Sequence, residues 1–349
     1  MENAVRRSFV QSLGAKAASI AHPLGAALKL ADTLRIGDRR HKISASRFLM
    51  GTQVTVVALH LSKDAAETAV ASAFSEMERL TAIFDRHRPG TPVSELNETG
   101  KLSDVAPELL EVMGKAQAYY HHSNGTFDAT VLPVLEMLQK NRAPKGRLML
   151  SQSDLDDALA LVGSGFVHVS KSGISFERSS MSVTLDGIGR GYIVDRASDL
   201  MAEFGVENHL ITAGGDIRAR GERAPGQPWI VAIESLSGKG GFPAVIRLKD
   251  SAVATSGGSE FYFDAERTRF HVPNPENAHF APSHHGCQLS LSVVAPSVME
   301  ADALSTSAFA MNPKEALRFI NGQKESECLI ASASGVKLDS RNWEAQVGI

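Results

Sequence analysis

Residues 183–204 read VTLDGIGRGYIVDRASDLMAEF and predict a short strand, a glycine-rich turn and a helix in succession. The strand is expected over 183–185 and the helix over 190–204, with Gly205 as its left-handed terminal residue. The glycines would let backbone approach a phosphate at the helix start, where the dipole favours an anion, and Arg190 would add a charged contact. A tight turn without a ligand is the alternative, since the spacing differs from the dinucleotide-binding fingerprint.

Strands and helices mix along the rest of the chain without a regular order. β-Branched, alternating runs predict strands over 50–61, 167–169, 174–176, 209–213, 229–234, 244–248, 289–294 and 328–331. Apolar residues at helical spacing predict helices over 64–84, 131–138, 153–161, 298–311 and 313–320, and one that follows Ser103 as its N-cap. Because no strand–helix–strand unit repeats, the sequence favours an α+β fold with mixed or antiparallel sheets and flanking helices.

The composition narrows the class of protein. Of 349 residues, 43% are hydrophobic and 21% are charged, which is typical of a globular protein and excludes disorder and coiled coils. A formal charge of −3 and 6% aromatic residues argue against nucleic-acid binding, which needs clustered cations or stacking side chains. Cys287 and Cys328 are too few for a disulfide scaffold or a zinc–thiolate site, and either form one bridge or stay as buried thiols.

Residues 1–45 differ from the rest and predict a leader or a flexible segment. Arg6-Arg7 stands before a bulky apolar pair, and a weakly apolar, Ala/Gly-rich stretch follows over 12–34. This is the layout of a twin-arginine export signal, which would place a domain over 46–349 in the periplasm or at the outer face of the inner membrane. Lys16 interrupts the apolar stretch, so an amphipathic helix with a chance Arg pair is the alternative. No uncharged apolar run of about 20 residues is present.

Three further clusters carry polar side chains. In ADALST, residues 301–306, Asp302 and Thr306 are four residues apart and share a helix face, where hard oxygen ligands suit Mg²⁺. The alternative is an acid in the first turn of the helix and a threonine bonded to its own helix. In NGTFDAT, residues 124–130, Asp128 either caps the next helix or faces a ligand. The Gly-Gly-Asp segment at 214–216 is by itself only a turn.

In their order and spacing, seven short blocks between about residues 50 and 331 resemble the ApbE family, the FAD:protein FMN transferases. The blocks are Met50-Gly51-Thr52, Ser94-Glu95-Leu96-Asn97, Gly125 to Thr130, Gly191-Tyr192-Ile193-Val194-Asp195, Gly214-Gly215-Asp216, Ala254-Thr255-Ser256-Gly257 and residues 301–306. The resemblance implies a single large domain related to the T-fold.

The activity that the resemblance implies is a Mg²⁺-dependent transfer of FMN from FAD to a Ser or Thr hydroxyl of an acceptor protein, with release of AMP. The implied partner is an acceptor flavoprotein subunit of a membrane or periplasmic redox system, and membrane association would come only through the leader or that acceptor. The implied metal ligands are Gly187, Asp302, Ser305 and Thr306. The implied FAD contacts are Met50, His87, Thr126, Phe127, Asp128, Thr184, Arg190 and Val272, and the implied catalytic residues are His271 and Asp302.

Two segments depart from the family pattern. His87 stands where the family commonly has a Tyr before a basic-Pro step. In 270–278 the family's Asp is Asn274 and its Thr-Gly pair is missing, although His271 remains as the candidate base for the acceptor hydroxyl. A pyrophosphatase that splits FAD into FMN and AMP, and a non-catalytic FAD-binding protein, are therefore the alternatives.

Overall fold

The computed structural model describes residues 34–35, 40–141, 151–235, 242–257 and 289–347. Its main feature is a nine-stranded antiparallel sheet in the order β1-β2-β3-β7-β8-β11-β12-β13-β14. The strands are β1 Leu34–Arg35, β2 His41–Leu49, β3 Thr52–His60, β7 Asn208–Ala213, β8 Asp216–Arg220, β11 Ser251–Gly257, β12 Leu289–Ala295, β13 Glu327–Ser332 and β14 Lys337–Asp339.

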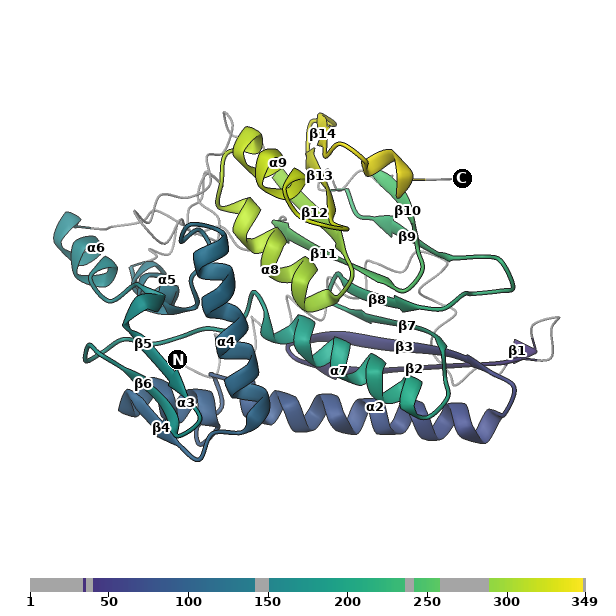
Figure 1. Ribbon diagram of the computed structural model, residues 1–349, viewed down its shortest axis with the longest axis horizontal. Coiled ribbons are helices and arrows are strands. Elements are labelled where there is room, and N and C mark those ends of the chain that lie inside the picture. Colours follow the sequence, from purple (N-terminus) through teal and green to yellow (C-terminus); the bar gives the residue numbers. More distant parts are fainter. Residues whose placement is uncertain (1–33, 36–39, 142–150, 236–241, 258–288, 348–349) are drawn as a thin grey trace, which may run out of the picture.

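One face of this sheet is covered by four helices that lie in the order α2, α7, α8, α9 (Figure 1). They are α2 Lys63–Phe84, α7 Gly189–Glu203, α8 Val298–Phe309 and α9 Pro313–Asn321. Alternate strand residues such as Val54, Val56 and Ala58 are fully buried beneath them. On α2 the apolar stripe at helical spacing, with Phe74, is likewise buried, as the sequence predicts.

The opposite face of the sheet packs against a hairpin of β9 Trp229–Ile233 and β10 Ala244–Leu248. Strand residues of the other alternation, among them Leu59, Val253 and Val294, form this second core with Trp229. Because successive side chains of a strand point to opposite faces, the central strands of the sheet contribute residues to both cores. Cys328 of β13 is a buried free thiol, whereas Cys287 lies outside the described residues.

The remaining described elements gather at one end of the molecule, beside α8 and the start of α7 (Figure 1). A small sheet in the order β4-β6-β5 packs there with four helices and short 3₁₀ turns. The elements are α3 Pro92–Thr99, β4 Lys101–Ser103, α4 Pro107–His122, η2 Ala129–Val131, α5 Leu132–Lys140, α6 Gln152–Leu159, η3 Ser164–Phe166, β5 Val167–Ser170 and β6 Gly173–Phe176, while η5 Trp343–Ala345 lies near the C terminus.

Two predicted elements are wrong. Residues 183–185 are not a strand, because the Asn97 side chain bonds both backbone groups of Val183, at 2.9 and 2.7 Å, and Thr184 N donates to Ala129 O at 2.8 Å. Ser103 does not cap a helix, since it ends β4, and α4 starts at Pro107 after Ala106 without a side-chain cap. The proline fixes the start of α4.

The sheet also begins earlier than the sequence suggests. The expected boundary between residues 45 and 46 falls inside β2, which pairs with β3 along its whole length. β2 reads HKISASRFL, and its alternation of small polar residues with modest apolar ones gives a weak strand signal. Met50 and Gly51 then form a two-residue hairpin turn with φ of 53° and 73°, the left-handed pair typical of a type I′ turn. Residues 1–33 lie outside the described residues.

Candidate functional site

Two glycine turns lie side by side at the end of the main sheet that faces the group of small helices. The Met50–Gly51 turn joins β2 to β3, and the Gly214–Gly215 turn joins β7 to β8. A Cβ placed on Gly214 would lie 2.8 Å from Oγ1 of Thr52, so only glycine allows this approach. Both turns have left-handed backbone, and Asp216 follows the second turn directly.

The glycine-rich turn before α7 packs directly against α8. A Cβ on Gly187 would lie 2.9 Å from Oγ1 of Thr306, which places the backbone of residue 187 beside that hydroxyl group. α7 begins at Gly189 without a side-chain cap and without an acidic residue in its first turn. Its positive dipole end is therefore not neutralised by its own sequence.

Asp302 is a buried carboxyl group at this place. Its side chain lies on α8 with 6% of the residue exposed, and Oδ2 has no hydrogen-bond partner in the described part of the chain. The backbone amide of Gly191 donates to the carboxyl group. Burial raises the pKa of Asp302 well above its ordinary value, the nearby Asp216 raises it further, and Arg190 opposes both. A buried carboxyl oxygen without a donor is a ready ligand for a cation.

Arg190 links the glycine-rich turn to the sheet. Its Nε lies 2.6 Å from Oδ2 of Asp216, which is 4% exposed, and the guanidinium side chain is one-third exposed. Burial raises the pKa of Asp216, although Arg190 acts against that rise. Arg190 thus stands between two buried acids, Asp216 and Asp302, and partly neutralises both.

Ser305 and Ser256 join α8 to β11. Their hydroxyl oxygens are 2.8 Å apart, and the Ser305 hydroxyl also donates to the backbone oxygen of Asp302 at 3.0 Å. Ser305 is fully buried, while Thr306 is only half-buried. The Ser305 hydroxyl therefore holds the helix in place, and Thr306 presents its hydroxyl toward the glycine-rich turn.

A profile of the ApbE family matches residues 50–330, which is most of the chain and includes every element of this site. The chain belongs to the ApbE family. The family and the α+β fold class expected from the sequence are confirmed, and so is the assignment as an enzyme.

Curated relatives of this ApbE-family chain are named FAD:protein FMN transferase. That of Haemophilus influenzae is 27% identical over 251 residues, which cover 69% of this chain and 72% of the relative. That of Escherichia coli (strain K12) is 27% identical over 242 residues, covering 67% and 68%. Among solved structures, the ApbE protein from Thermotoga maritima has a TM-score of 0.78 at 25% identity, over 88% of this chain and 100% of its own. The flavin transferase ApbE from Vibrio cholerae has a TM-score of 0.75 at 21% identity, over 88% and 100%, and supports the fold alone.

The structure brings together four of the predicted positions in this ApbE-family chain: Gly187, Arg190, Asp302 and Thr306. Ser305 is adjacent, but its hydroxyl already bonds the Ser256 hydroxyl and the backbone oxygen of Asp302. Among the described residues, no group of three or more His, Cys, Asp and Glu side chains could hold a metal ion. A metal bound by described residues here would therefore have at most two such side chains and would need hydroxyl, carbonyl or substrate oxygens to complete its shell.

Predicted FAD contacts from the 126–128 segment lie next to this centre. Asp128 accepts four bonds, from the amide and hydroxyl of Thr130 and of Ser164, at 2.7–3.1 Å, so its side chain caps η2 and organises the loop. Phe127 is buried, and Thr126 is half-buried with its hydroxyl donating to a loop carbonyl. Thr184 connects this loop to the glycine-rich turn, because its amide bonds Ala129 O and its hydroxyl accepts from Asp186 N.

Sequence reasoning missed Arg86 at the edge of the site. Its Nη2 lies 3.0 Å from Oδ2 of Asp186, one residue before Gly187, and it is mostly buried, whereas Asp186 is mostly exposed. His87 is exposed and is close enough to help lower the pKa of Asp186. The basic residues around the 87–89 step were the available signal. His271 and Val272 lie outside the described residues.

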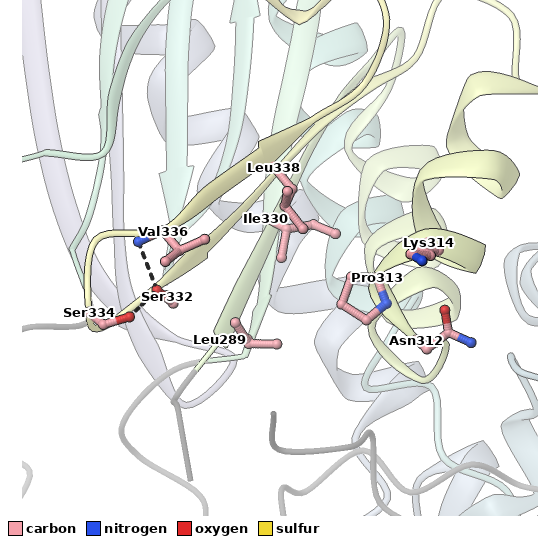
Figure 2. Close-up of a pocket in the computed structure, with 9 residues that line it drawn as sticks. All are labelled: Leu289, Asn312, Pro313, Lys314, Ile330, Ser332, Ser334, Val336 and Leu338. Atoms are coloured by element: carbon pink, nitrogen blue, oxygen red, sulfur yellow. Dashed lines mark hydrogen bonds between the residues drawn. The ribbon is translucent and has the colours of Figure 1, made fainter. Parts of the chain in front are cut away.

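A separate apolar hollow of about 430 Å³ lies between the β12–β13–β14 edge of the sheet and the start of α9 (Figure 2). Figure 2 shows Leu289, Ile330 and Leu338 on one side and Pro313 on the other. None of the residues that gather around Asp302 lines it. Within the described ranges, no helix is long and apolar enough to cross a bilayer.

Proposed function

We propose that the chain transfers the FMN part of FAD to a Ser or Thr hydroxyl of an acceptor protein and releases AMP. The relatives' name, FAD:protein FMN transferase, supports the donor and the transferred group. One observation of the site carries the proposal: a buried carboxyl group with a free oxygen, Asp302, lies beside the start of α7, which has no N-cap side chain and no acidic residue of its own. A metal ligand and an anion site thus lie together, as transfer from a pyrophosphate requires.

Magnesium is the proposed metal, because the oxygens available at this place are hard ligands. The Asp302 carboxylate, the Thr306 hydroxyl and the Gly187 carbonyl are the proposed ligands, with Ser305 behind them. Mg²⁺ commonly binds through one or two carboxylates and completes its shell with water and substrate phosphates. When bound, it would neutralise charge on the pyrophosphate and help AMP to leave.

The protein's own groups would orient the donor. The dipole at the start of α7 favours the pyrophosphate, and Arg190, held at 2.6 Å by Asp216, presents a fixed guanidinium group beside it. Met50, Thr126, Phe127, Thr184 and His87 are the proposed contacts for the rest of FAD. Asp128 would act by holding its loop.

In the proposed step the acceptor hydroxyl oxygen forms a bond to the phosphorus on the FMN side of the pyrophosphate. The bond from that phosphorus to the bridging oxygen breaks, and AMP leaves with that oxygen. The hydroxyl proton passes to a base, for which His271 is the proposed residue. The sequence alone supports this last assignment.

The proposed location is the periplasm or the outer face of the inner membrane, and the proposed acceptor is a subunit of a redox system there. The Arg6-Arg7 pair and the mild apolar stretch after it support this location. Fusing residues 1–45 to a reporter that is active only after twin-arginine export tests it. An Arg6→Lys, Arg7→Lys fusion that is exported as well as the unchanged one would contradict the signal.

The deciding experiment incubates the purified chain with FAD, Mg²⁺ and candidate acceptors and measures the acceptor mass. A gain of one flavin mononucleotidyl group on a Ser or Thr, lost with Asp302→Ala, supports the transferase. Steady release of FMN and AMP without acceptor favours the pyrophosphatase instead. Recovery of intact FAD from every incubation favours a binding protein.

A further inference from the structure

Asp195 on α7 caps the start of a different helix, α8. Its Oδ1 accepts from Val298 N at 2.9 Å and its Oδ2 from Met299 N at 2.8 Å. The Ser297 side chain accepts from Glu300 N at 3.2 Å, so three amides of the first turn are bonded by two side chains. Helix starts leave such amides without partners inside the helix, and a single N-cap side chain commonly bonds one of them. α8 therefore has a local cap and a second cap from its neighbour.

The contact between α7 and α8 is made at two levels, one turn apart on α7. Four residues before Asp195, the Gly191 amide donates to the carboxyl group of Asp302. Between these two bonds the helices approach so closely that a Cβ on Gly191 would lie 2.6 Å from Cα of Met299. Each helix thus supplies an acid to the amides of the other: Asp195 of α7 accepts from α8, and Asp302 of α8 accepts from α7. Sliding α8 along α7 would break both bonds.

Arg218 adds the sheet to the same cluster. It donates to the backbone oxygen of Pro296, just before α8, and its Nε lies 3.8 Å from Oδ1 of Asp195. Arg218 belongs to β8, the strand that begins with Asp216, the partner of Arg190. The cluster of Asp195, Arg218 and the start of α8 therefore joins the three elements that carry Arg190, Asp216 and Asp302.

We propose that Asp195 is a positioning residue that fixes the α8 ligands Asp302 and Thr306 at the correct distance from the Gly187 turn. This inference rests on the proposed function in one respect, the binding of a divalent cation at Asp302. The effect of Asp195 on the position of α8 can be tested without flavin, acceptor or turnover.

Burial sets a cost on this arrangement. Burial raises the pKa of Asp195 to about 6, although the two amides and Arg218 act against the rise. The charged groups that face it are Arg218 from β8 and Asp199 from the next turn of α7, and Tyr119 of α4 also lies within its field. Keeping Asp195 ionised therefore costs folding free energy, which its bonds to the two α8 amides and the nearby Arg218 partly offset.

The test compares Asp195→Asn with Asp199→Asn at pH 7. Asparagine has nearly the same shape as aspartate, but its side-chain NH₂ group would face one of the two amides. Both groups are donors, so that bond is lost. Asp199 is the matched control, because it lies one turn further along α7, half exposed and paired with Arg220. Hydrogen exchange of the 296–310 region and binding of Mn²⁺ by calorimetry are measured for both, with Asp302→Ala identifying the metal site.

We expect Asp195→Asn to speed exchange at Val298 and Met299 about tenfold, the usual effect of losing a helix cap, and to weaken Mn²⁺ binding by a similar factor. Exchange in α2, β2 and β3 should stay unchanged. Arg218→Gln should give the same pattern to a smaller extent. Asp199→Asn should change neither quantity.

Unchanged exchange in α8 together with unchanged Mn²⁺ affinity in Asp195→Asn would overturn the proposal. So would an equal loss of protection across the whole sheet, because that pattern means general stability. If the unaltered chain binds no Mn²⁺, the proposed metal site fails. The exchange data still decide whether Asp195 holds the start of α8 in place.

Discussion

Gly191 of α7 lies against Met299 of α8 so closely that an added Cβ would be 2.6 Å from Met299 Cα and 2.7 Å from its amide nitrogen. These are backbone atoms, which cannot rotate away as the end of a side chain can. α7 carries the phosphate turn and α8 carries the candidate metal ligands. The two helices can pack at this distance only because residue 191 has no side chain. This contact gives the first prediction.

Gly191→Ala should push α7 and α8 apart and lower the free energy of unfolding by about 1–3 kcal/mol, the usual cost of overpacking. Gly114→Ala is the matched control, since Gly114 is also inside a helix, α4, and an added Cβ there meets nothing within 4 Å. It should raise stability by about 0.5–1 kcal/mol through helix propensity. Urea unfolding measures both, and equal effects of the two substitutions would contradict the predicted contact.

Gly187→Ala should leave the fold intact and damage the site. The added Cβ would lie 2.9 Å from Oγ1, 3.1 Å from Cγ2 and 3.3 Å from Cβ of Thr306, so this one side chain would have to shift, whereas no backbone atom is among these nearest contacts. We expect a change in unfolding free energy below about 1 kcal/mol and a loss of flavin transfer of about tenfold or more, because the Thr306 hydroxyl would be displaced. Gly165→Ala, which meets nothing within 4 Å, is the control. Full activity in Gly187→Ala would show that this approach is not needed.

Much of the site could be predicted from the sequence because its parts are local patterns. The four-residue spacing of Asp302 and Thr306 places them on one face of a helix, and α8 indeed spans both. The glycines before α7 predict a close backbone approach, which Gly187 makes to Thr306. Strand alternation likewise predicts β7, which buries alternate residues, whereas β3 is a β-branched run that is buried on both faces.

What the sequence did not predict depends on contacts between residues that are far apart in the chain. Val183 looks like strand but is bonded by Asn97, 86 positions earlier. The Arg86–Asp186 pair spans 100 positions, and the Asp195 bond to Met299 spans 104. Side-chain bonds of this kind leave no periodic pattern, so only the packed structure reveals them.

Asp302→Asn should separate stability from activity. The substitution removes a buried acid whose pKa is raised by burial and by Asp216, so the metal-free protein should unfold at the same temperature or a higher one. Flavin transfer should fall by at least about 100-fold, since the proposed metal loses its only carboxylate. Mg²⁺ should raise the melting temperature of the unaltered protein but not that of Asp302→Asn.

The control for this substitution is Asp157→Asn on the exposed surface of α6, which should retain both activity and the Mg²⁺ shift. A marked loss of stability in Asp302→Asn would mean that the carboxylate has a structural role in place of the proposed one. A retained Mg²⁺ shift would move the metal site elsewhere.

The pH dependence of stability should report the buried acid at Asp195. Its pKa is raised to about 6 in the folded chain, above the ordinary value of 3.8, so the folded state binds this proton more tightly than the unfolded state. The stability that this tighter proton binding gives to the folded state is present below about pH 4 and is lost as the pH rises through about 6. Relative to Asp195→Asn, the unaltered protein should therefore lose on the order of 2 kcal/mol between pH 4 and pH 7 in metal-free urea unfolding. Asp199→Asn controls for removing a carboxylate from α7, and a difference between Asp195→Asn and the unaltered protein that is equal at both pH values would contradict the prediction.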